Sequence, residues 1–124
     1  MNYSNAISYF DQAITKNPSL AEAYFFKGAA MRRNGQWVKA IDEIKKSLEL
    51  NPRLFFNWLQ LEESYSLLAD WENAERAIQM AEELVGEHII VKYHKARILI
   101  NQHKEIEAAT ELLIATQHLS LIHI

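Results

Sequence analysis

Apolar residues recur along this chain three and four positions apart, with polar residues between them, which is the period of an amphipathic α-helix. Three of these segments end at a pair that disfavours further helix: Asn34-Gly35, Asn51-Pro52 or Val85-Gly86. Two helix starts are also marked, by Asp70 as an N-cap and by Ser19 with Glu22 as a capping box. We therefore predict an all-α fold of about seven helices. The six clearest fall within residues 19–33, 36–50, 54–68, 71–84, 89–101 and 104–118.

A period of 34 residues underlies this pattern. Alanine recurs at this step, and a second series of small residues follows it. An aromatic series and a large apolar series share the step, although Glu105 breaks the aromatic one. The four series are Ala6, Ala40, Ala74 and Ala108; Ala13, Ser47, Ala81 and Ala115; Tyr3, Trp37 and Trp71; and Phe10, Ile44, Ile78 and Leu112. One amphipathic helix cannot produce four series in phase, so we predict an array of repeated units.

The small residues have a mechanical explanation. Two antiparallel helices joined by a short turn must approach to about 8–10 Å, which requires small side chains at the contact. We expect Gly28 to face Ala40 in one helix pair and Ala96 to face Ala108 in another. The series that contains Ser47 is expected to let the second helix of each unit nest against the first helix of the next unit.

These residues resemble the tetratricopeptide repeat family, whose units are helix–turn–helix pairs of 34 residues. Residues 21–54 match its pattern at Tyr24, Gly28, Gly35, Trp37, Ala40, Ile44, Ser47 and Pro52. Residues 55–88 match at Trp58, Leu61, Tyr65, Trp71, Ala74, Ile78 and Ala81, and residues 89–118 match at Ala96, Leu99, Ala108, Leu112 and Ala115. The resemblance implies a right-handed superhelical α-solenoid of antiparallel helix pairs, which acts as a non-catalytic scaffold for protein–protein interaction.

The resemblance also implies the domain organisation. A repeat array over residues 1–118 would contain a half unit (2–20), two full units (21–54 and 55–88) and a degenerate unit (89–118). Lys27 and Lys95 replace a preferred leucine, and Glu62 replaces a small residue. We expect these long side chains to reach water along their stems. The alternative is that they point at a ligand.

The two ends of the chain carry further expectations. The half unit indicates that the protein extends upstream or that Met1 is an internal or engineered start. The last six residues, LSLIHI at 119–124, contain no charged group apart from the titratable His123. They can be reverse-translated into a transposase adapter sequence, so one interpretation is a non-native tail. The other interpretation is a genuine apolar helix end that packs on the last unit.

The composition excludes several classes of protein. The 124 residues are 49% hydrophobic and 23% charged, as expected for one soluble globular domain. The net charge of −3, from interspersed acidic and basic residues, gives no electrostatic reason to bind nucleic acid. The lack of cysteine excludes disulfides and thiolate chemistry. No signal peptide or membrane span is predicted, so we expect no membrane partner and, by default, a cytoplasmic location.

No catalytic, metal-binding or cofactor-binding motif is found in the sequence. The histidines are not arranged as in a zinc hydrolase; they are His88, His94, His103, His118 and His123. Glycine-rich phosphate loops are absent, and the acidic pairs Glu62-Glu63 and Glu82-Glu83 are typical of solvated helix faces. We therefore predict that the protein is not an enzyme and holds neither a metal ion nor a cofactor.

In the tetratricopeptide family, the first helices of successive units line a concave groove, and the resemblance assigns its positions here residue by residue. They are Glu22, Phe25, Phe26, Ala29 and Arg33; Phe56, Leu59, Gln60, Glu63 and Leu67; and Ile90, Tyr93, His94, Arg97 and Asn101. Phe25 and Ala29 replace the lysine and asparagine with which some members clamp a terminal carboxylate, so we do not expect that ligand. An extended or helical peptide with apolar anchors and a few charges suits these positions. The alternative is that Phe25, Phe56 and Leu59 belong partly to the core.

Three functions follow from this interpretation. The first is a scaffold that binds a protein or peptide segment of unknown identity in the concave groove. The second is a recruiting or regulatory segment of a larger enzyme, such as a glycosyltransferase or a signalling protein. The third is self-association through the incomplete ends of the array.

Overall fold

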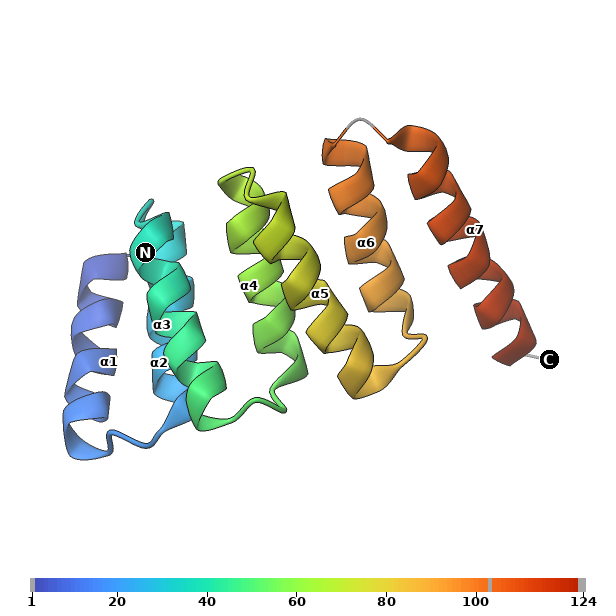
Figure 1. Ribbon diagram of the computed structural model, residues 1–124. Helices are drawn as coiled ribbons and strands as arrows, with labels where there is room; N and C mark the ends of the chain where they lie inside the picture. Colours follow the sequence, from blue (N-terminus) through green and yellow to red (C-terminus); the bar gives the residue numbers. More distant parts are fainter. Residues whose placement is uncertain (1, 103, 123–124) are drawn as a thin grey trace.

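The structure, a computed structural model, describes residues 2–102 and 104–122, and the side chains of Glu105 and of residues 118–122 lie outside the description. Within these ranges it consists of seven α-helices and contains no β-strand. They are α1 (Tyr3–Lys16), α2 (Ala21–Arg33), α3 (Trp37–Leu50), α4 (Phe55–Leu67), α5 (Trp71–Val85), α6 (Ile89–Asn101) and α7 (Glu105–Ile122) (Figure 1). The predicted all-α fold is confirmed, and the bounds of α2 to α6 differ from prediction by at most two residues.

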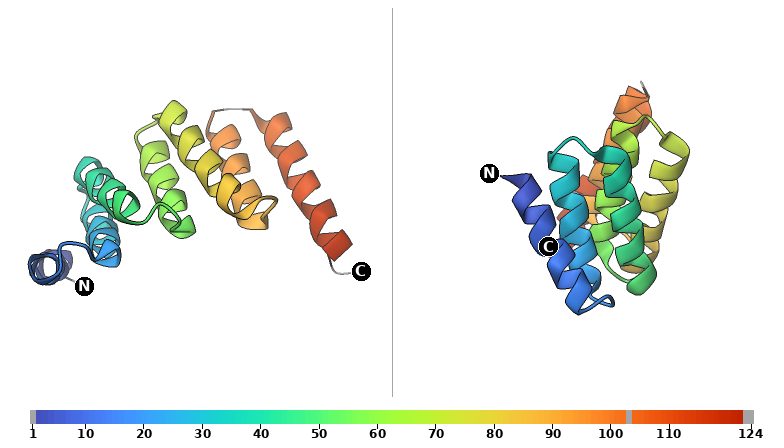
Figure 2. Two further views of the ribbon diagram at one scale, coloured as in Figure 1. Left: turned by 60° about the horizontal axis from the view of Figure 1, so that its bottom comes forward. Right: turned by 90° about the vertical axis from the view of Figure 1, so that its left-hand side faces the viewer.

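The helices form a curved array of antiparallel pairs. The pairs are α2 with α3, α4 with α5 and α6 with α7, while α1 packs against α2 (Figure 1). The first helices α2, α4 and α6 also contact one another in sequence, whereas in the described residues the second helices α3, α5 and α7 do not. Because the first helices are closer together, the array curves toward them and their shared surface, the concave face, lies on the inside of the bend. Figure 2 shows the helices following one another along this arc.

The turns between units repeat the same hydrogen bonds. The Asn17 side chain accepts from the N–H of Ser19 (3.2 Å), and the phenol of Tyr24 donates to the carbonyl of Pro18 (3.2 Å). One unit later, Asn51 accepts from the N–H of Arg53 (3.1 Å), and the indole of Trp58 donates to the carbonyl of Pro52 (2.8 Å). The Asn-Pro pairs therefore fix the connection between units through the aromatic residue of the following helix.

One of the two predicted helix starts is correct. Asp70 caps α5, because its carboxylate accepts from the N–H of Asn73 (3.3 Å). The predicted capping box at Ser19 is wrong, because α2 has Leu20 at its N-cap and no side chain caps it. Ser19 lies one position too early, and its N–H is already used in the Asn17 turn.

The small residues lie where the helices approach most closely. Ala40 and Ala74 are 0% exposed and Ala108 is 1% exposed. A Cβ atom added to Gly28 would lie 2.8 Å from Cγ1 of Ile44 and 3.1 Å from the carbonyl oxygen of Ala40. The predicted contact between Gly28 and Ala40 is therefore confirmed, and it leaves no room for a larger side chain.

The second small series joins one unit to the next, as predicted. Ser47 is fully buried in α3, and its hydroxyl accepts a hydrogen bond of 2.9 Å from the side-chain amide of Asn57 in α4. Ala81 of α5 is also fully buried, in a cluster with Val91 and Ile98 of α6. A small side chain at this position thus lets each second helix rest on the first helix that follows.

Glu62 is buried and Lys27 is half-buried, both beside polar partners, so the expectation that their ends reach water is wrong for Glu62 and holds for Lys27 only in part. The Lys27 side chain is 15% exposed, with Nζ 2.7 Å from Oδ1 of Asp11 in α1 and 3.4 Å from Oε1 of Glu43 in α3. Glu62 is fully buried in α4, with Oε2 3.4 Å from Nδ1 of His94 in α6. Neighbouring helices supply the partners that make this burial tolerable.

The pKa of Lys27 is raised above its ordinary value. Burial has the largest single effect and lowers the pKa, but the hydrogen bonds and negative charges of Asp11 and Glu43 together outweigh it. The lysine is therefore protonated at neutral pH, and its charge links α1, α2 and α3.

The last helix is longer than predicted. α7 continues to Ile122 and so includes the backbone of residues 119–122 from the LSLIHI segment, while His123 and Ile124 lie outside the described residues. This helix fits either interpretation of the tail, and both stand. In the described part of the chain, no helix is long and apolar enough to cross a membrane.

The substitution Ala40→Leu tests the close helix contact. It adds an isopropyl group at a fully buried position, and such overpacking lowers the free energy of unfolding by about 1–3 kcal/mol, measurable by urea denaturation. The matched control is Val38→Leu, since Val38 is 64% exposed on the same helix and its variant should stay within about 0.5 kcal/mol of wild type. Equal stabilities of the two variants would contradict the packing account.

Candidate functional site

The positions assigned to a groove lie on the three first helices of the array. Phe25, Phe26, Ala29 and Arg33 belong to α2; Phe56, Leu59, Gln60 and Glu63 belong to α4; and Tyr93, His94, Arg97 and Asn101 belong to α6. Each of these helices exposes one large aromatic side chain: Phe26 is 50%, Phe56 is 62% and Tyr93 is 54% exposed. Three successive units thus each present an aromatic ring to solvent.

The remaining groove positions differ in burial. Leu59 is 3% exposed and His94 is 6% exposed, so these two side chains belong to the interior. Phe25, Ala29 and Gln60 are half-buried. Arg33 and Asn101 are exposed at the carboxyl ends of their helices. The interpretation as core residues is therefore correct for Leu59, whereas Phe56 lies at the surface.

Each exposed aromatic ring lies against a second ring. Phe26 stacks on Phe10 of α1 with ring centroids 6.0 Å apart, and it meets the edge of Phe25 at 5.3 Å. The ring of Phe56 lies 5.0 Å from that of Phe55. Tyr93 meets His94 edge to face at 5.7 Å. Each exposed ring therefore has an aromatic neighbour at the centroid distance of a favourable ring pair.

A charged network crosses the concave face and joins all three units. Glu63 of α4 accepts from Nη1 of Arg32 in α2 (2.9 Å) and from Nη1 of Arg97 in α6 (3.2 Å). Nε2 of His94 lies 3.8 Å from the same carboxylate. Two guanidinium groups therefore share one carboxylate, and the exposed Arg33 adds a further positive charge at this end of α2.

Sequence reasoning missed the contact between Glu62 and His94. Glu62 occupies a position at which the neighbouring units have Gly28 and Ala96, and its Oε1 atom has no hydrogen-bond partner in the structure. The sequence contains an indication of this contact. A glutamate at a repeat position that small residues occupy in the neighbouring units needs a polar partner on an adjacent helix.

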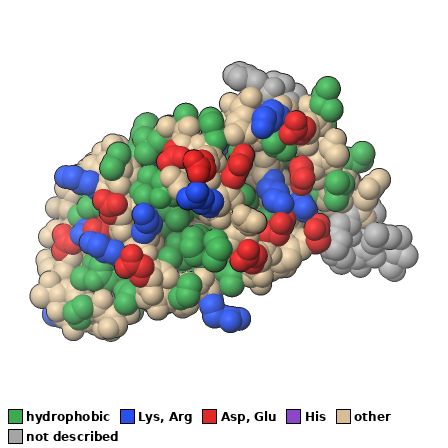
Figure 3. Space-filling view, in the orientation of Figure 1, with side chains coloured by type: hydrophobic (Ala, Val, Ile, Leu, Met, Phe, Trp, Pro, Cys, Tyr) green, Lys and Arg blue, Asp and Glu red, His purple; other side chains and the backbone are tan. Residues whose placement is uncertain are grey.

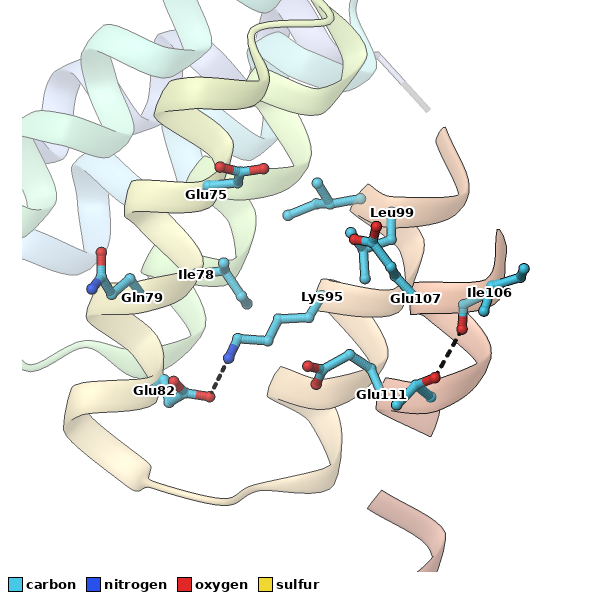
Figure 4. A pocket seen from close by; sticks show the side chains of 11 residues that line it. Glu75, Ile78, Gln79, Glu82, Lys95, Leu99, Ile106, Glu107 and Glu111 are labelled. Carbon is cyan, nitrogen blue, oxygen red and sulfur yellow. Dashed lines mark hydrogen bonds and ion pairs between the residues drawn. The ribbon is translucent and has the colours of Figure 1, made fainter. Parts of the chain in front are cut away.

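A pocket of about 540 Å³ opens between α5, α6 and α7, on the side of the array where the second helices lie (Figure 4). Its lining residues are Glu75, Ile78, Gln79, Glu82, Lys95, Ile98, Leu99, Ile106, Glu107, Thr110 and Glu111. In the space-filling view from the same side as Figure 1, acidic and basic side chains alternate over the surface with apolar ones between them (Figure 3). No motif in the sequence predicts this pocket.

Lysine side chains neutralise one end of the pocket. Nζ of Lys95 lies 2.6 Å from Oε2 of Glu82, so this third departure from the pattern is also ion-paired rather than extended to water. Nζ of Lys92 lies 3.5 Å from Glu82, 3.4 Å from Glu87 and 3.5 Å from Glu111. Lys92 is 8% exposed, so three carboxylates compensate the charge of a buried amine.

These contacts shift the pKa values of two groups in opposite directions. The hydrogen bond from Lys95, helped by the charges of Lys95 and Lys92, lowers the pKa of Glu82 against the effect of burial. For Lys92, burial has the largest single effect and lowers the pKa, but the charges of Glu111, Glu82 and Glu87 outweigh it and raise the pKa. Both groups are therefore ionised at neutral pH.

Comparison with known families identifies the repeat. The family model described as anaphase-promoting complex, cyclosome, subunit 3, matches residues 1–81. The chain belongs to this family. Its repeats are tetratricopeptide-like, so the predicted resemblance is confirmed. No curated protein sequence matches the chain.

Solved structures confirm the fold. A crystal structure of MamA superimposes with a TM-score of 0.83 over 93% of this chain and 67% of that chain, at 18% sequence identity. MamA 41-end from Desulfovibrio magneticus RS-1 gives a TM-score of 0.82 over 93% of this chain and 65% of that chain, at 21% identity. The chain thus spans about two thirds of the length of these structures. At this identity the likeness shows the fold alone.

The fold determines the general class of function. A tetratricopeptide-like array is a protein-interaction scaffold, and proteins of this family are generally non-catalytic. In the described residues, no group of three or more histidine, cysteine, aspartate and glutamate side chains is arranged to hold a metal ion.

The lowered pKa of Glu82 predicts an acid dependence of stability. Since folding lowers this pKa, the ionised carboxylate stabilises the fold at neutral pH, and the contribution is lost as the pH falls through the folded-state pKa. Melting temperature should therefore fall less steeply on acidification in Glu82→Gln than in wild type. Thermal denaturation followed by circular dichroism from neutral to acidic pH measures this. The control is Glu83→Gln, a substitution at the exposed neighbouring residue, which should keep the wild-type dependence of melting temperature on pH. The same dependence in all three proteins would refute the stabilising role of Glu82.

Proposed function

We propose that the concave face binds a segment of a partner protein through aromatic anchors. The observation that supports this best is the exposure of Phe26, Phe56 and Tyr93, one ring from each first helix. Rings of this size cost free energy while they are exposed to water, so a partner that covers them gains binding energy. Aromatic side chains are also the commonest sources of binding energy at protein interfaces.

The support of each ring by a second ring favours binding further. A side chain that is already held in one orientation loses little conformational freedom when a partner covers it. Phe26, which lies against Phe10 and Phe25, is the best example. The concave face is therefore suited to an extended or helical segment that places apolar side chains on successive units.

The charge of the concave face favours an acidic residue in that segment. Arg32 and Arg97 share the single carboxylate of Glu63, and Arg33 is exposed nearby along the chain. Guanidinium groups bind carboxylates through paired hydrogen bonds. We expect the partner segment to combine apolar anchors with at least one aspartate or glutamate.

The matched family supports a role in holding proteins together, since its description names a subunit of a complex. The same face would serve a recruiting or regulatory segment of a larger enzyme, such as a glycosyltransferase or a signalling protein. Both roles require the same binding event, so one experiment addresses them together.

Selection of random peptides on the immobilised protein tests the proposal. We expect the selected peptides to share apolar residues and an acidic residue, and the variants Phe56→Ala and Tyr93→Ala to weaken their binding about tenfold or more. Fluorescence anisotropy with a labelled selected peptide gives the dissociation constants. Both side chains are more than half exposed, so neither variant should lower the melting temperature by more than a few degrees.

An exposed aromatic residue outside the concave face provides the matched control. Tyr9 of α1 is 68% exposed, and Tyr9→Ala should leave the dissociation constant unchanged. If Tyr9→Ala weakens binding as much as Phe56→Ala, or if neither concave-face variant has an effect, the proposed site is wrong.

Self-association is a second candidate, which the apolar surface of α7 favours. Ile106 is 85%, Leu113 is 59% and Ile114 is 44% exposed. Light scattering across a concentration series should then show a mass that rises with concentration and returns to the monomer value in Leu113→Glu. A constant monomer mass for the wild-type protein would exclude this candidate.

A further inference from the structure

The pocket between α5, α6 and α7 occupies a place that is filled one repeat earlier. At the junction of α3, α4 and α5, the corresponding space holds an apolar cluster in which every member is at most 6% exposed. Four of its residues are Ile41, Leu48, Leu61 and Ala77. Their counterparts 34 residues later are Glu75, Glu82, Lys95 and Glu111, and all four line the pocket. The pocket therefore exists because charged residues replace the side chains that fill the preceding junction.

The pocket keeps an apolar floor beneath these charges. Ile78 and Ile98 are each 3% exposed, and Leu99 lies beside them on α6. A site that combines an apolar floor with a polar rim, in a volume of about 540 Å³, has the size and character of a binding pocket rather than of a packing defect.

The charges at the rim are compensated at one end only. Lys95 and Lys92 lie within ion-pair distance of Glu82, and Lys92 also lies within that distance of Glu111. At the other end, beside Leu99, the carboxylates of Glu75 and Glu107 have no cation partner in the part of the chain that the structure describes (Figure 4). Glu75 only accepts a hydrogen bond of 3.4 Å from the side-chain amide of Gln102.

We infer that this pocket is a second binding site, which takes a basic amphipathic segment of a partner protein. An apolar side chain of the segment lies on Ile78, Ile98 and Leu99, and a lysine or arginine beside it pairs with Glu75 and Glu107. The apolar floor argues against a simple metal ion as the ligand, because isoleucine and leucine supply no ligand atoms. A side chain with an aliphatic stem and a charged end uses both parts of the site.

The site is separate from the concave face. The pocket residues of α6 are Lys95, Ile98 and Leu99, whereas Tyr93 and Arg97 belong to the concave face of the same helix. One array is therefore able to hold two segments of opposite charge at once, an acidic one on the concave face and a basic one in the pocket.

The probe for this inference is the peptide acetyl-LKKLLKKLLKKL-amide, titrated into the full chain and followed by isothermal calorimetry. We expect saturable binding that weakens at least tenfold in the double variant Glu75→Gln/Glu107→Gln. Thr110→Trp, which fills the pocket without changing its charge, should weaken binding to a similar extent. Replacing every lysine of the peptide by glutamate, or every leucine by glutamine, should abolish binding.

A charge-matched variant separates the pocket from the general acidity of the protein. Glu49→Gln/Glu83→Gln removes two exposed carboxylates elsewhere and should leave the dissociation constant within twofold of wild type. Equal weakening by both double variants, or unchanged binding in Thr110→Trp, overturns the inference. Phe56→Ala and Tyr93→Ala should not affect this peptide, so failure of the concave-face proposal and failure of the pocket inference are distinguishable.

Discussion

The close approach of paired helices at small residues determines the rest of the structure. Ala40 and Ala74 are completely buried, and Gly28 leaves no space for even one methyl group. Because these contacts fix the distance within each pair, and Ser47 and Ala81 fix the distance between pairs, the units stack with one spacing and the first helices come into contact. The three first helices, each with one exposed aromatic ring, thereby share one surface. No single unit would provide that surface, so the candidate binding face is a consequence of the repeat spacing.

The junctions between units differ in the residues that fill them. At the junction of α3, α4 and α5, Leu61 and Ala77 are apolar. In the preceding and the following junction, lysine and glutamate occupy the same two repeat positions. Replacing apolar burial by ion pairs seldom increases stability, because each charge loses its hydration. At the first junction Lys27 and Glu43 pair directly across the helices. At the last junction the charges border an open pocket, which is why we assign them a role in binding rather than in packing.

The sequence was sufficient for the architecture and insufficient for the placement of the charged residues. The spacing of alanines specified the helix contacts, because a small side chain in a regular column has one mechanical explanation. Glu62 was placed wrongly, and Lys27 only partly correctly, because the choice between water and the interior depends on a partner from another helix, such as Asp11 or His94. The pocket was missed for a different reason: it becomes apparent only when all equivalent positions of successive repeats are compared, including the change from Leu48 to Glu82. The aromatic groove positions were carried over from the family, and burial then separated Leu59 from its exposed neighbours.

We propose that the surface formed by α2, α4 and α6 holds a partner segment. Backbone-amide NMR shifts of the labelled protein, recorded during titration with a peptide selected for binding, locate the bound segment on the array. If a partner binds on the concave face, the largest shifts fall in residues 21–33, 55–67 and 89–101, and residues 37–50 and 71–85 change little. The largest shifts in α3 and α5, with α2, α4 and α6 unchanged, would contradict the proposal.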